Sequence, residues 1–157
     1  MPIVGFRHIG IIVSDLQKSL DFYEGILKLK LIQNKKDDSE YISEITGLNG
    51  LVAEYAKLLI PGGNVLELLT YPSHPLLRVA RDIHQPGEAH LAFEVSSAEE
   101  MYSLIVRRNI PYISAPVLSS EKIAKVFFCF DPDGYRIEIV EMLTDSYSWN
   151  PLANEKK

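Results

Sequence analysis

The chain has 157 residues, of which 46% are hydrophobic and 24% are charged, so it can bury the core of one domain or of two fused half-domains. Its net charge is -5 and Lys and Arg form no cluster, which argues against a nucleic-acid-binding protein. The single cysteine, Cys129, excludes an intrachain disulfide, and no apolar stretch approaches the roughly 18 residues of a membrane span. A cytoplasmic protein with no membrane partner is therefore expected.

The first predicted elements are a strand in "HIGIIV" and a helix that follows it. Ser14 is followed three residues later by Gln17, which is the spacing of a capping box at the start of a helix. Leu16, Leu20 and Tyr23 then recur at helical spacing. Three strands are predicted after this helix, near residues 30–35, 51–60 and 64–71.

The same order of elements is predicted again 82 residues later, from "HLAFEVSSAEEM". His90 aligns with His8, and Ser96 is followed by Glu99 as a second capping box. The offset falls to 71 towards the end of each half, because "DDSEYISEITGLNG" lengthens the first half. Strands of the second half are predicted near residues 112–117, 123–130 and 135–142.

The repeated unit is βαβββ, and short turns join the strands that follow each helix, so the predicted class is α+β. Two tandem modules are expected to form a curved, eight-stranded sheet within a single domain. A short helix is predicted from about Pro75 between the modules, and Trp149 is a candidate for docking from the polar tail. The predicted divisions are a first module at 5–71, a linker at 72–87, a second module at 88–142 and a tail at 143–157.

Four polar residues occupy equivalent positions in the two modules. His8 and His90 lie on the first strand of each module, and Glu67 and Glu138 lie among aliphatic residues on the last. A lone carboxylate is costly to bury, and a bound cation would compensate its charge. If a pseudo-twofold axis relates the modules, two imidazoles and two carboxylates meet, and this donor set suits a divalent metal ion.

Taken singly, each of these residues is more often structural, and the metal prediction depends on the repeated pattern. The remaining polar candidates lack such a pattern and are interpreted as structural or solvated. They are His74 and His84 in the linker, the buried thiol of Cys129, and the strand residues Glu94, Arg136 and Glu141.

Three segments, "HIGIIVSDLQKSLDFYEGILKLKLI", "GEAHLAFEVSSAEE" and "DPDGYRIEIVE", resemble the vicinal oxygen chelate superfamily. This superfamily includes glyoxalase I, methylmalonyl-CoA epimerase, extradiol dioxygenases and the fosfomycin- and bleomycin-resistance proteins. The resemblance covers about residues 5–142 and implies paired βαβββ modules around a metal site, usually in a homodimer. It implies one Zn, Ni, Co, Mn or Fe ion bound by His8, Glu67, His90 and Glu138, within one chain or across two.

Within the superfamily, the His-Glu-His-Glu set and "DPDGYRIEIVE" look most like glyoxalase I, the lactoylglutathione lyase. The resemblance implies a lyase or isomerase in which Glu67 or Glu138 removes a proton next to the carbonyl of a small hemithioacetal. The linker looks instead like methylmalonyl-CoA epimerase, which implies an acyl thioester substrate. Two further alternatives are an Fe(II) extradiol dioxygenase that uses His8, His90 and Glu138, and a drug-binding resistance protein without enzymatic activity.

Overall fold

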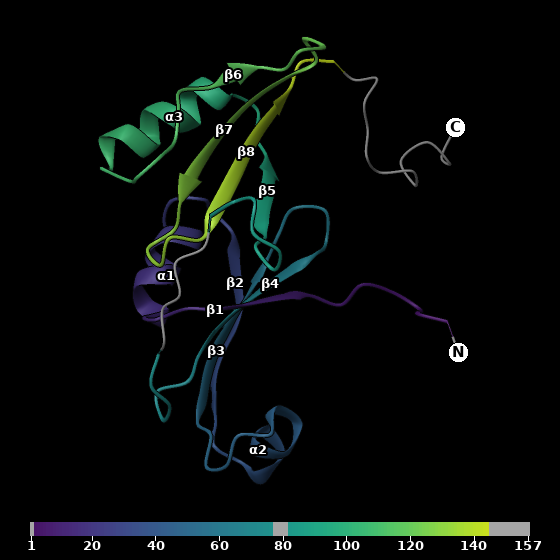
Figure 1. The fold of residues 1–157 in the computed structure, drawn as a ribbon, viewed down its shortest axis with the longest axis vertical. Helices are drawn as coiled ribbons and strands as arrows, with labels where there is room; N and C mark the ends of the chain where they lie inside the picture. Colours follow the sequence, from purple (N-terminus) through teal and green to yellow (C-terminus); the bar gives the residue numbers. More distant parts are fainter. Residues whose placement is uncertain (1, 77–81, 145–157) are drawn as a thin grey trace. The chain divides into compact units, whose positions relative to one another are not determined.

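The structure, a computed structural model, describes residues 2–76 and 82–144 and divides into two compact units (Figure 1). The units are Met1–Ala80 and Arg81–Lys157, and their boundary falls within the segment predicted as a linker. The helix predicted from about Pro75 extends into residues outside the described part, and Trp149 also lies outside it. In the described residues, no helix is long and apolar enough to cross a membrane.

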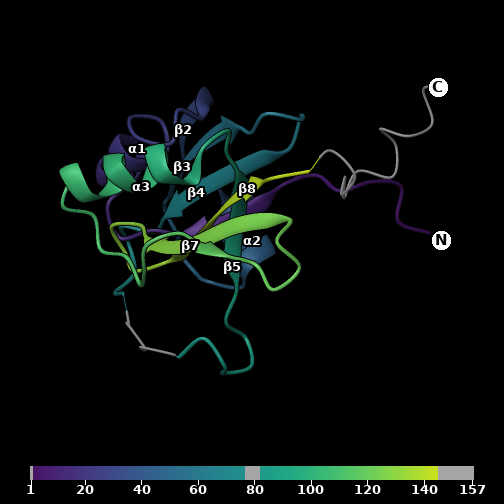
Figure 2. The same ribbon diagram turned by 90° about the horizontal axis from the view of Figure 1, so that it is seen from above.

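The first unit contains a four-stranded sheet in the order β1-β4-β3-β2. Strand β1 is parallel to β4, and the other neighbouring strands are antiparallel. Helix α1 packs against β3 and β4 (Figure 2). The elements are β1 (Ile9–Ile12), α1 (Leu16–Tyr23), β2 (Lys30–Asp37), α2 (Glu40–Thr46), β3 (Ala53–Leu59) and β4 (Val65–Thr70).

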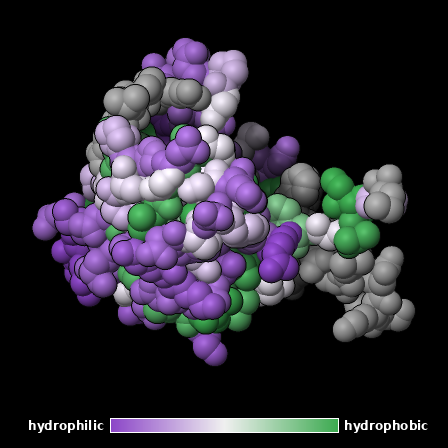
Figure 3. All heavy atoms as spheres, turned by 90° about the horizontal axis from the view of Figure 1, so that it is seen from below, coloured by the Kyte–Doolittle hydropathy of each residue, from purple (hydrophilic) through white to green (hydrophobic). Residues whose placement is uncertain are grey.

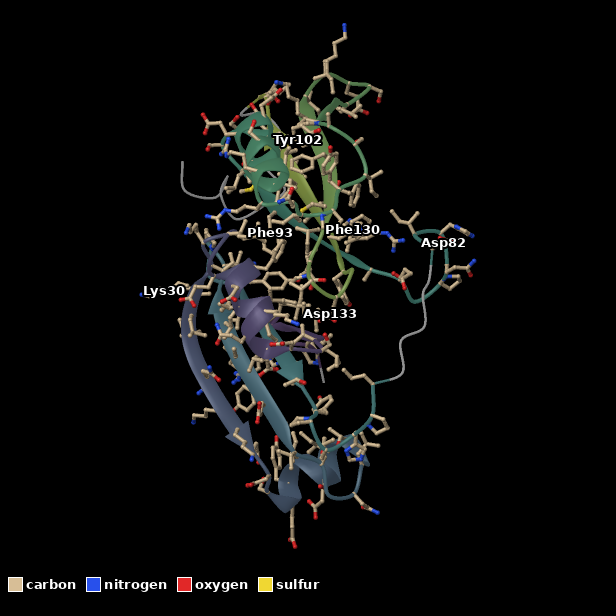
Figure 4. All side chains as sticks on the ribbon, turned by 90° about the vertical axis from the view of Figure 1, so that its left-hand side faces the viewer. Lys30, Asp82, Phe93, Tyr102, Phe130 and Asp133 are labelled. Atoms are coloured by element: carbon tan, nitrogen blue, oxygen red, sulfur yellow. The ribbon has the colours of Figure 1, made fainter. Side chains whose placement is uncertain are left out.

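The second unit repeats this topology, with the strand order β5-β8-β7-β6 and a parallel pairing of β5 with β8. Helix α3 packs against β7 and β8. Its Tyr102, which is labelled in Figure 4, stands edge-on to the ring of Phe127 of β7, with 5.7 Å between the ring centroids. The elements are β5 (His90–Glu94), α3 (Ala98–Arg107), β6 (Val117–Leu118), β7 (Ala124–Phe130) and β8 (Arg136–Met142). The predicted α+β class and its two βαβββ modules are confirmed, and hydrogen bonds divide the eight described strands into two four-stranded sheets.

Both repeated helices begin one residue later than the capping boxes predict. Asp15 and Ser97, rather than Ser14 and Ser96, are the N-caps. Each accepts a hydrogen bond from the backbone N–H three residues later, at 3.1 and 3.2 Å respectively. Asp and Ser are both strong N-caps, so either of two consecutive polar residues can start the helix. The offset of 82 residues survives, because both caps move by one position.

The residues predicted to complete the capping boxes have other partners. Gln17 donates a hydrogen bond to Asp21, four residues later on α1, at 2.9 Å. Glu99 forms an ion pair with Lys125 of β7, and the hydrogen bond from this ammonium lowers the pKa of Glu99. The Glu99–Lys125 pair therefore links α3 to the sheet instead of capping the helix.

The structure differs from the predicted elements at two further places. The strand predicted at 112–117 is reduced to β6 and an isolated bridge between Tyr112 and Cys129, because Pro116 lacks the N–H that a strand interior requires. The segment that lengthens the first half contains α2, which was not predicted. This helix ends at Gly47 in the left-handed conformation, and it buries Ile42 against Leu51 and Ala53.

The central strands β4 and β8 are buried on one face and more open on the other. Leu66 and Leu68 of β4 are fully buried, as are Ile137 and Ile139 of β8. Alternation along a strand then places the intervening residues on the opposite face. These partly exposed residues are Val65, Glu67 and Leu69 of β4, and Arg136, Glu138 and Val140 of β8. Elsewhere on the surface, hydrophobic residues are interspersed with hydrophilic ones on the face shown in Figure 3.

Cys129 lies on the buried side of β7 and is inaccessible to solvent, as the sequence predicts. Burial disfavours the thiolate and raises the pKa of Cys129 to about 12. We expect Cys129 to react with dithiobis-nitrobenzoate at pH 8 at least about 1000-fold more slowly in the folded protein than in urea. The rate in the folded protein should increase as the pH rises towards 12. A folded-state rate within tenfold of the unfolded rate would contradict the buried position, and no other thiol contributes to the signal.

Candidate metal centre

In the first unit, a histidine and a lysine contact the two oxygens of Glu67. Glu67 lies in β4, between Gly10 of β1 and Lys57 of β3 in the strand register. His8 immediately precedes β1, and its Nε2 atom lies 3.1 Å from Oε2 of Glu67. The Nζ atom of Lys57 lies 3.3 Å from Oε1. Only 12% of the Glu67 side chain is exposed, so these two contacts compensate a carboxylate that is largely removed from water.

In the second unit, Glu138 occupies the same place but has a different neighbour. It lies in β8 between Ala92 of β5 and Phe128 of β7. The Nε2 atom of His90, the first residue of β5, lies 3.0 Å from Oε2 of Glu138. The imidazole stands edge-on to the ring of Phe128, with 5.6 Å between the ring centroids. The His–Glu pair is thus repeated, whereas a phenyl ring replaces the ammonium group of Lys57.

Small residues flank both carboxylates on the first strand of each sheet. A Cβ atom at Gly10 would lie 3.2 Å from Cδ1 of Leu69 and 3.9 Å from Oε2 of Glu67. Ala92 holds the matching position beside Glu138. A Cβ atom at Gly10 would therefore press on the Leu69 side chain, while it would only be in ordinary van der Waals contact with the Glu67 oxygen that faces His8.

Tyr71 follows β4 and lies close enough to Glu67 to sense its charge. Partial burial raises the pKa of Tyr71, and the negative charge of Glu67 raises it further. Both effects disfavour the phenolate, so Tyr71 stays neutral. The contacts of Glu67 itself are with the imidazole of His8 and the ammonium of Lys57.

The turn before β8 is fixed by Asp131, a residue that no sequence pattern indicated. Its buried carboxylate accepts hydrogen bonds from the backbone N–H groups of Asp133, at 2.9 Å, and of Tyr135, at 2.7 Å. Gly134 adopts a positive φ of 84° in this turn, which favours glycine. The "DPDG" turn thereby sets where β8 begins and which face Glu138 occupies.

Two residues interpreted as solvated strand positions have structural partners instead. The guanidinium of Arg136 pairs with Glu88 at 3.0 Å, and 15% of the Arg136 side chain is exposed. Glu141 accepts a hydrogen bond at 2.9 Å from the backbone N–H of Ala98, at the start of α3. Glu94 is exposed, as predicted. Partners from distant segments explain the two corrections, and a single strand pattern does not reveal such partners.

The two linker histidines, His74 and His84, form hydrogen bonds with residues outside the His–Glu pairs. His74 is hydrogen-bonded to Ser73 at 2.9 Å, and His84 to Gln85 at 3.0 Å. Each of these contacts is with a neighbouring residue in the chain and on the exposed side. The structure therefore adds no metal-binding role for either histidine.

Each His–Glu pair fits a divalent cation in chemistry and in spacing. A neutral imidazole nitrogen and a carboxylate oxygen are common ligands of such ions, at about 2.0–2.2 Å. Two ligand atoms that are each about 2.1 Å from one ion, with an angle of about 90° at the ion, lie about 3.0 Å from each other. The two pairs have nitrogen–oxygen distances of 3.1 and 3.0 Å. The same spacing suits a hydrogen bond from the ring N–H to the carboxylate, so a cation would replace that proton.

The structure brings the four predicted ligands together as two pairs. Within residues 2–76 and 82–144, no group of three or more His, Cys, Asp or Glu side chains is arranged to hold a metal ion. The binding of one ion by His8, Glu67, His90 and Glu138 remains a prediction. Lys57 was missed, although its position gave a signal, because it stands inside a strand where the repeat places Phe128.

Residues 5–139 match the family model of the Glyoxalase/Bleomycin resistance protein/Dioxygenase superfamily. The chain is 31% identical over 139 residues to the lactoylglutathione lyase of Escherichia coli O157:H7, covering 85% of this chain and 90% of that one. It is 30% identical over 142 residues to the uncharacterized protein YwkD of Bacillus subtilis, covering 90% of this chain and 99% of the relative.

Solved structures share the fold at lower sequence identity. A glyoxalase family protein from Bacillus cereus has a TM-score of 0.84 at 21% identity, covering 92% of this chain and 97% of that one. The fosfomycin resistance protein FosX from Listeria monocytogenes, in complex with Mn(II) and sulfate, has a TM-score of 0.57 at 18% identity. That match covers 89% of this chain and 93% of that one.

Proposed function

The chain belongs to the Glyoxalase/Bleomycin resistance protein/Dioxygenase superfamily, and on this premise we propose that it is a metal-dependent enzyme. The proposed reaction removes a proton from a carbon next to a carbonyl group, as in glyoxalase I. The observation that carries the proposal is the His–Glu pair, which recurs at equivalent positions of both units with nitrogen–oxygen distances of 3.1 and 3.0 Å. The similarity to a lactoylglutathione lyase supports the same reaction class.

We propose that His8, Glu67, His90 and Glu138 bind one divalent ion, which is Zn, Ni, Co, Mn or Fe, in a homodimeric protein. The four ligands come from one chain or from two. When bound, the ion would polarise the substrate carbonyl and stabilise the negative charge that develops on its oxygen. The imidazoles would bind through neutral nitrogens, and the two carboxylates would offset the charge of the ion.

The two carboxylates differ in their surroundings, and this difference supports separate roles. Lys57 holds Oε1 of Glu67 while His8 faces Oε2, so both oxygens are engaged. In the described part of the chain, the ion pair of Glu138 is with His90. We therefore assign Glu67 as a fixed ligand and Glu138 as the general base. Glu138 would take the proton from the substrate carbon and return it to a carbon of the product.

Solvent deuterium incorporation tests the reaction class. The protein, loaded in turn with each of the five metals, is incubated in deuterium oxide with two substrates. These are the hemithioacetal of methylglyoxal and glutathione, and a 2-methyl-branched acyl-CoA. We expect deuterium on the carbon next to the carbonyl in one of them, because the base exchanges its proton with water before returning it. Label in the hemithioacetal product indicates a lyase, and label in the acyl-CoA indicates an epimerase.

The control is the same protein without metal, which should give no label. Oxygen consumption with a catechol and Fe(II), without label in either substrate, would contradict the proposal and favour the dioxygenase alternative. That alternative would use only His8, His90 and Glu138 as ligands.

A further inference from the structure

The more open face of the first sheet carries cationic and polar side chains beside Glu67. Lys57 pairs in register with Glu67 on one side and with Gln33 of β2 on the other. Two residues away, Tyr55 pairs with Lys35, and the Nζ atom of Lys57 lies 5.3 Å from the centre of the Tyr55 ring. Between Glu67 and the β2 edge, this face of the sheet therefore carries side chains that can attract anions or donate hydrogen bonds to them.

The second sheet has no such cation at the equivalent place. Phe128 replaces Lys57, and Arg136, the cation on the same face of β8, pairs with Glu88 at 3.0 Å. The cationic character beside the carboxylate is thus a property of the first unit, and the repeat does not require it. Lys57 and Phe128 occupy equivalent positions beside the candidate ligands but differ in chemistry. Such a difference between the two units is more informative about substrate specificity than a residue that both units share.

The charges of the metal ion, its proposed ligands and Lys57 indicate what Lys57 would contact in the metal-bound protein. Two carboxylates neutralise a divalent ion and the imidazoles are neutral, so the ammonium of Lys57 adds one uncompensated positive charge. Only 24% of its side chain is exposed, and a partly buried charge is costly unless it is paired. Lysine carries three N–H donors, of which one suffices for Glu67. A further donor can therefore bind an anion that lies beside the metal.

We propose that Lys57 is a specificity-determining residue that binds a carboxylate group of the substrate. This inference rests on the proposed function and narrows the substrate class to carbonyl compounds that carry a carboxylate group. The carboxylate would provide the negative charge that the site lacks, and Lys57 would hold it beside Glu67. Neutral compounds of the same shape would bind less tightly.

The test compares glycolate with glycolamide, two small probes that offer the same hydroxyl group and differ in charge. Their dissociation constants are measured by calorimetry on Co(II)-loaded protein, and the Co(II) absorption spectrum reports binding at the metal. We expect the preference for glycolate to fall about tenfold or more in Lys57→Met, because a charge-assisted hydrogen bond is lost. Lys57→Arg should keep most of the preference. Lys36→Met, which removes the same charge from the opposite face of the same sheet, should leave it unchanged.

An unchanged preference in Lys57→Met at full Co(II) content would overturn the inference. Loss of Co(II) from Lys57→Met would overturn it as well, because Lys57 would then act on Glu67 and not on the substrate. A wild-type protein that takes up no Co(II) would contradict the proposed function itself, and this inference with it.

Discussion

Replacing Glu138 with Gln should lower the turnover number by about 10²- to 10⁴-fold, which is the usual contribution of a general base. The amide keeps the shape of the side chain and an oxygen for the metal, but it cannot accept the substrate proton. Glu138 is chosen because its neighbour on β7 is Phe128, whereas an ammonium group holds Glu67. The measurement is the rate of deuterium incorporation into whichever substrate the protein accepts, at equal metal content.

The matched control is Glu67→Gln, which makes the same change at the equivalent position of the other unit. A fixed ligand can keep its oxygen on the metal as an amide, so this variant should lose no more than about tenfold in turnover. A larger loss in Glu67→Gln than in Glu138→Gln would reverse the assignment of the base. Equal losses of proton exchange in both variants, with metal retained, would contradict the division of roles.

Much of the fold could be predicted because the sequence contains an internal repeat of the βαβββ unit. Strand alternation placed Glu67 and Glu138 on the faces opposite the buried residues, and the paired sheets confirm the repeated unit. The errors occur where one half carries no counterpart, as in α2, or where proline interrupts a hydrophobic segment, as at Pro116. Local patterns also left the helix starts uncertain by one residue, because Asp15 and Ser97 cap as well as the serines before them.

The two His–Glu pairs of the candidate site, which recur in both units, were predicted. The residues that occur in one unit alone, such as Lys57, were missed. The pairing of each histidine with the glutamate of its own module follows from the parallel register of β1 with β4 and of β5 with β8. Lys57 and Asp131 belong to no repeated pattern, so their roles emerged only from their contacts. Side chains that bridge distant strands depend on which strands are neighbours and in which register they pair, and the residue pattern of a single strand contains neither.

Replacing either His8 or His90 with Ala should weaken metal binding by at least about 100-fold, which is more than the loss typical of a residue that only supports a ligand. Each histidine contributes one of two nitrogen donors in the proposed set, and alanine leaves its glutamate without the imidazole at 3.0–3.1 Å. The measurement is competition for Zn(II) or Co(II) with a chelating dye. His74→Ala and His84→Ala are the controls, because these histidines lie in the segment between the modules, and both variants should bind metal as the wild type does.

In the proposed metal centre, the two His–Glu pairs bind one ion together and not one ion each. The most direct test is the metal content per chain, by mass spectrometry of the dialysed protein, in the wild type and in the His8→Ala and His90→Ala variants. We expect one ion per chain in the wild type and close to none in either variant. Two ions per chain in the wild type, with one retained in each variant, would contradict this expectation.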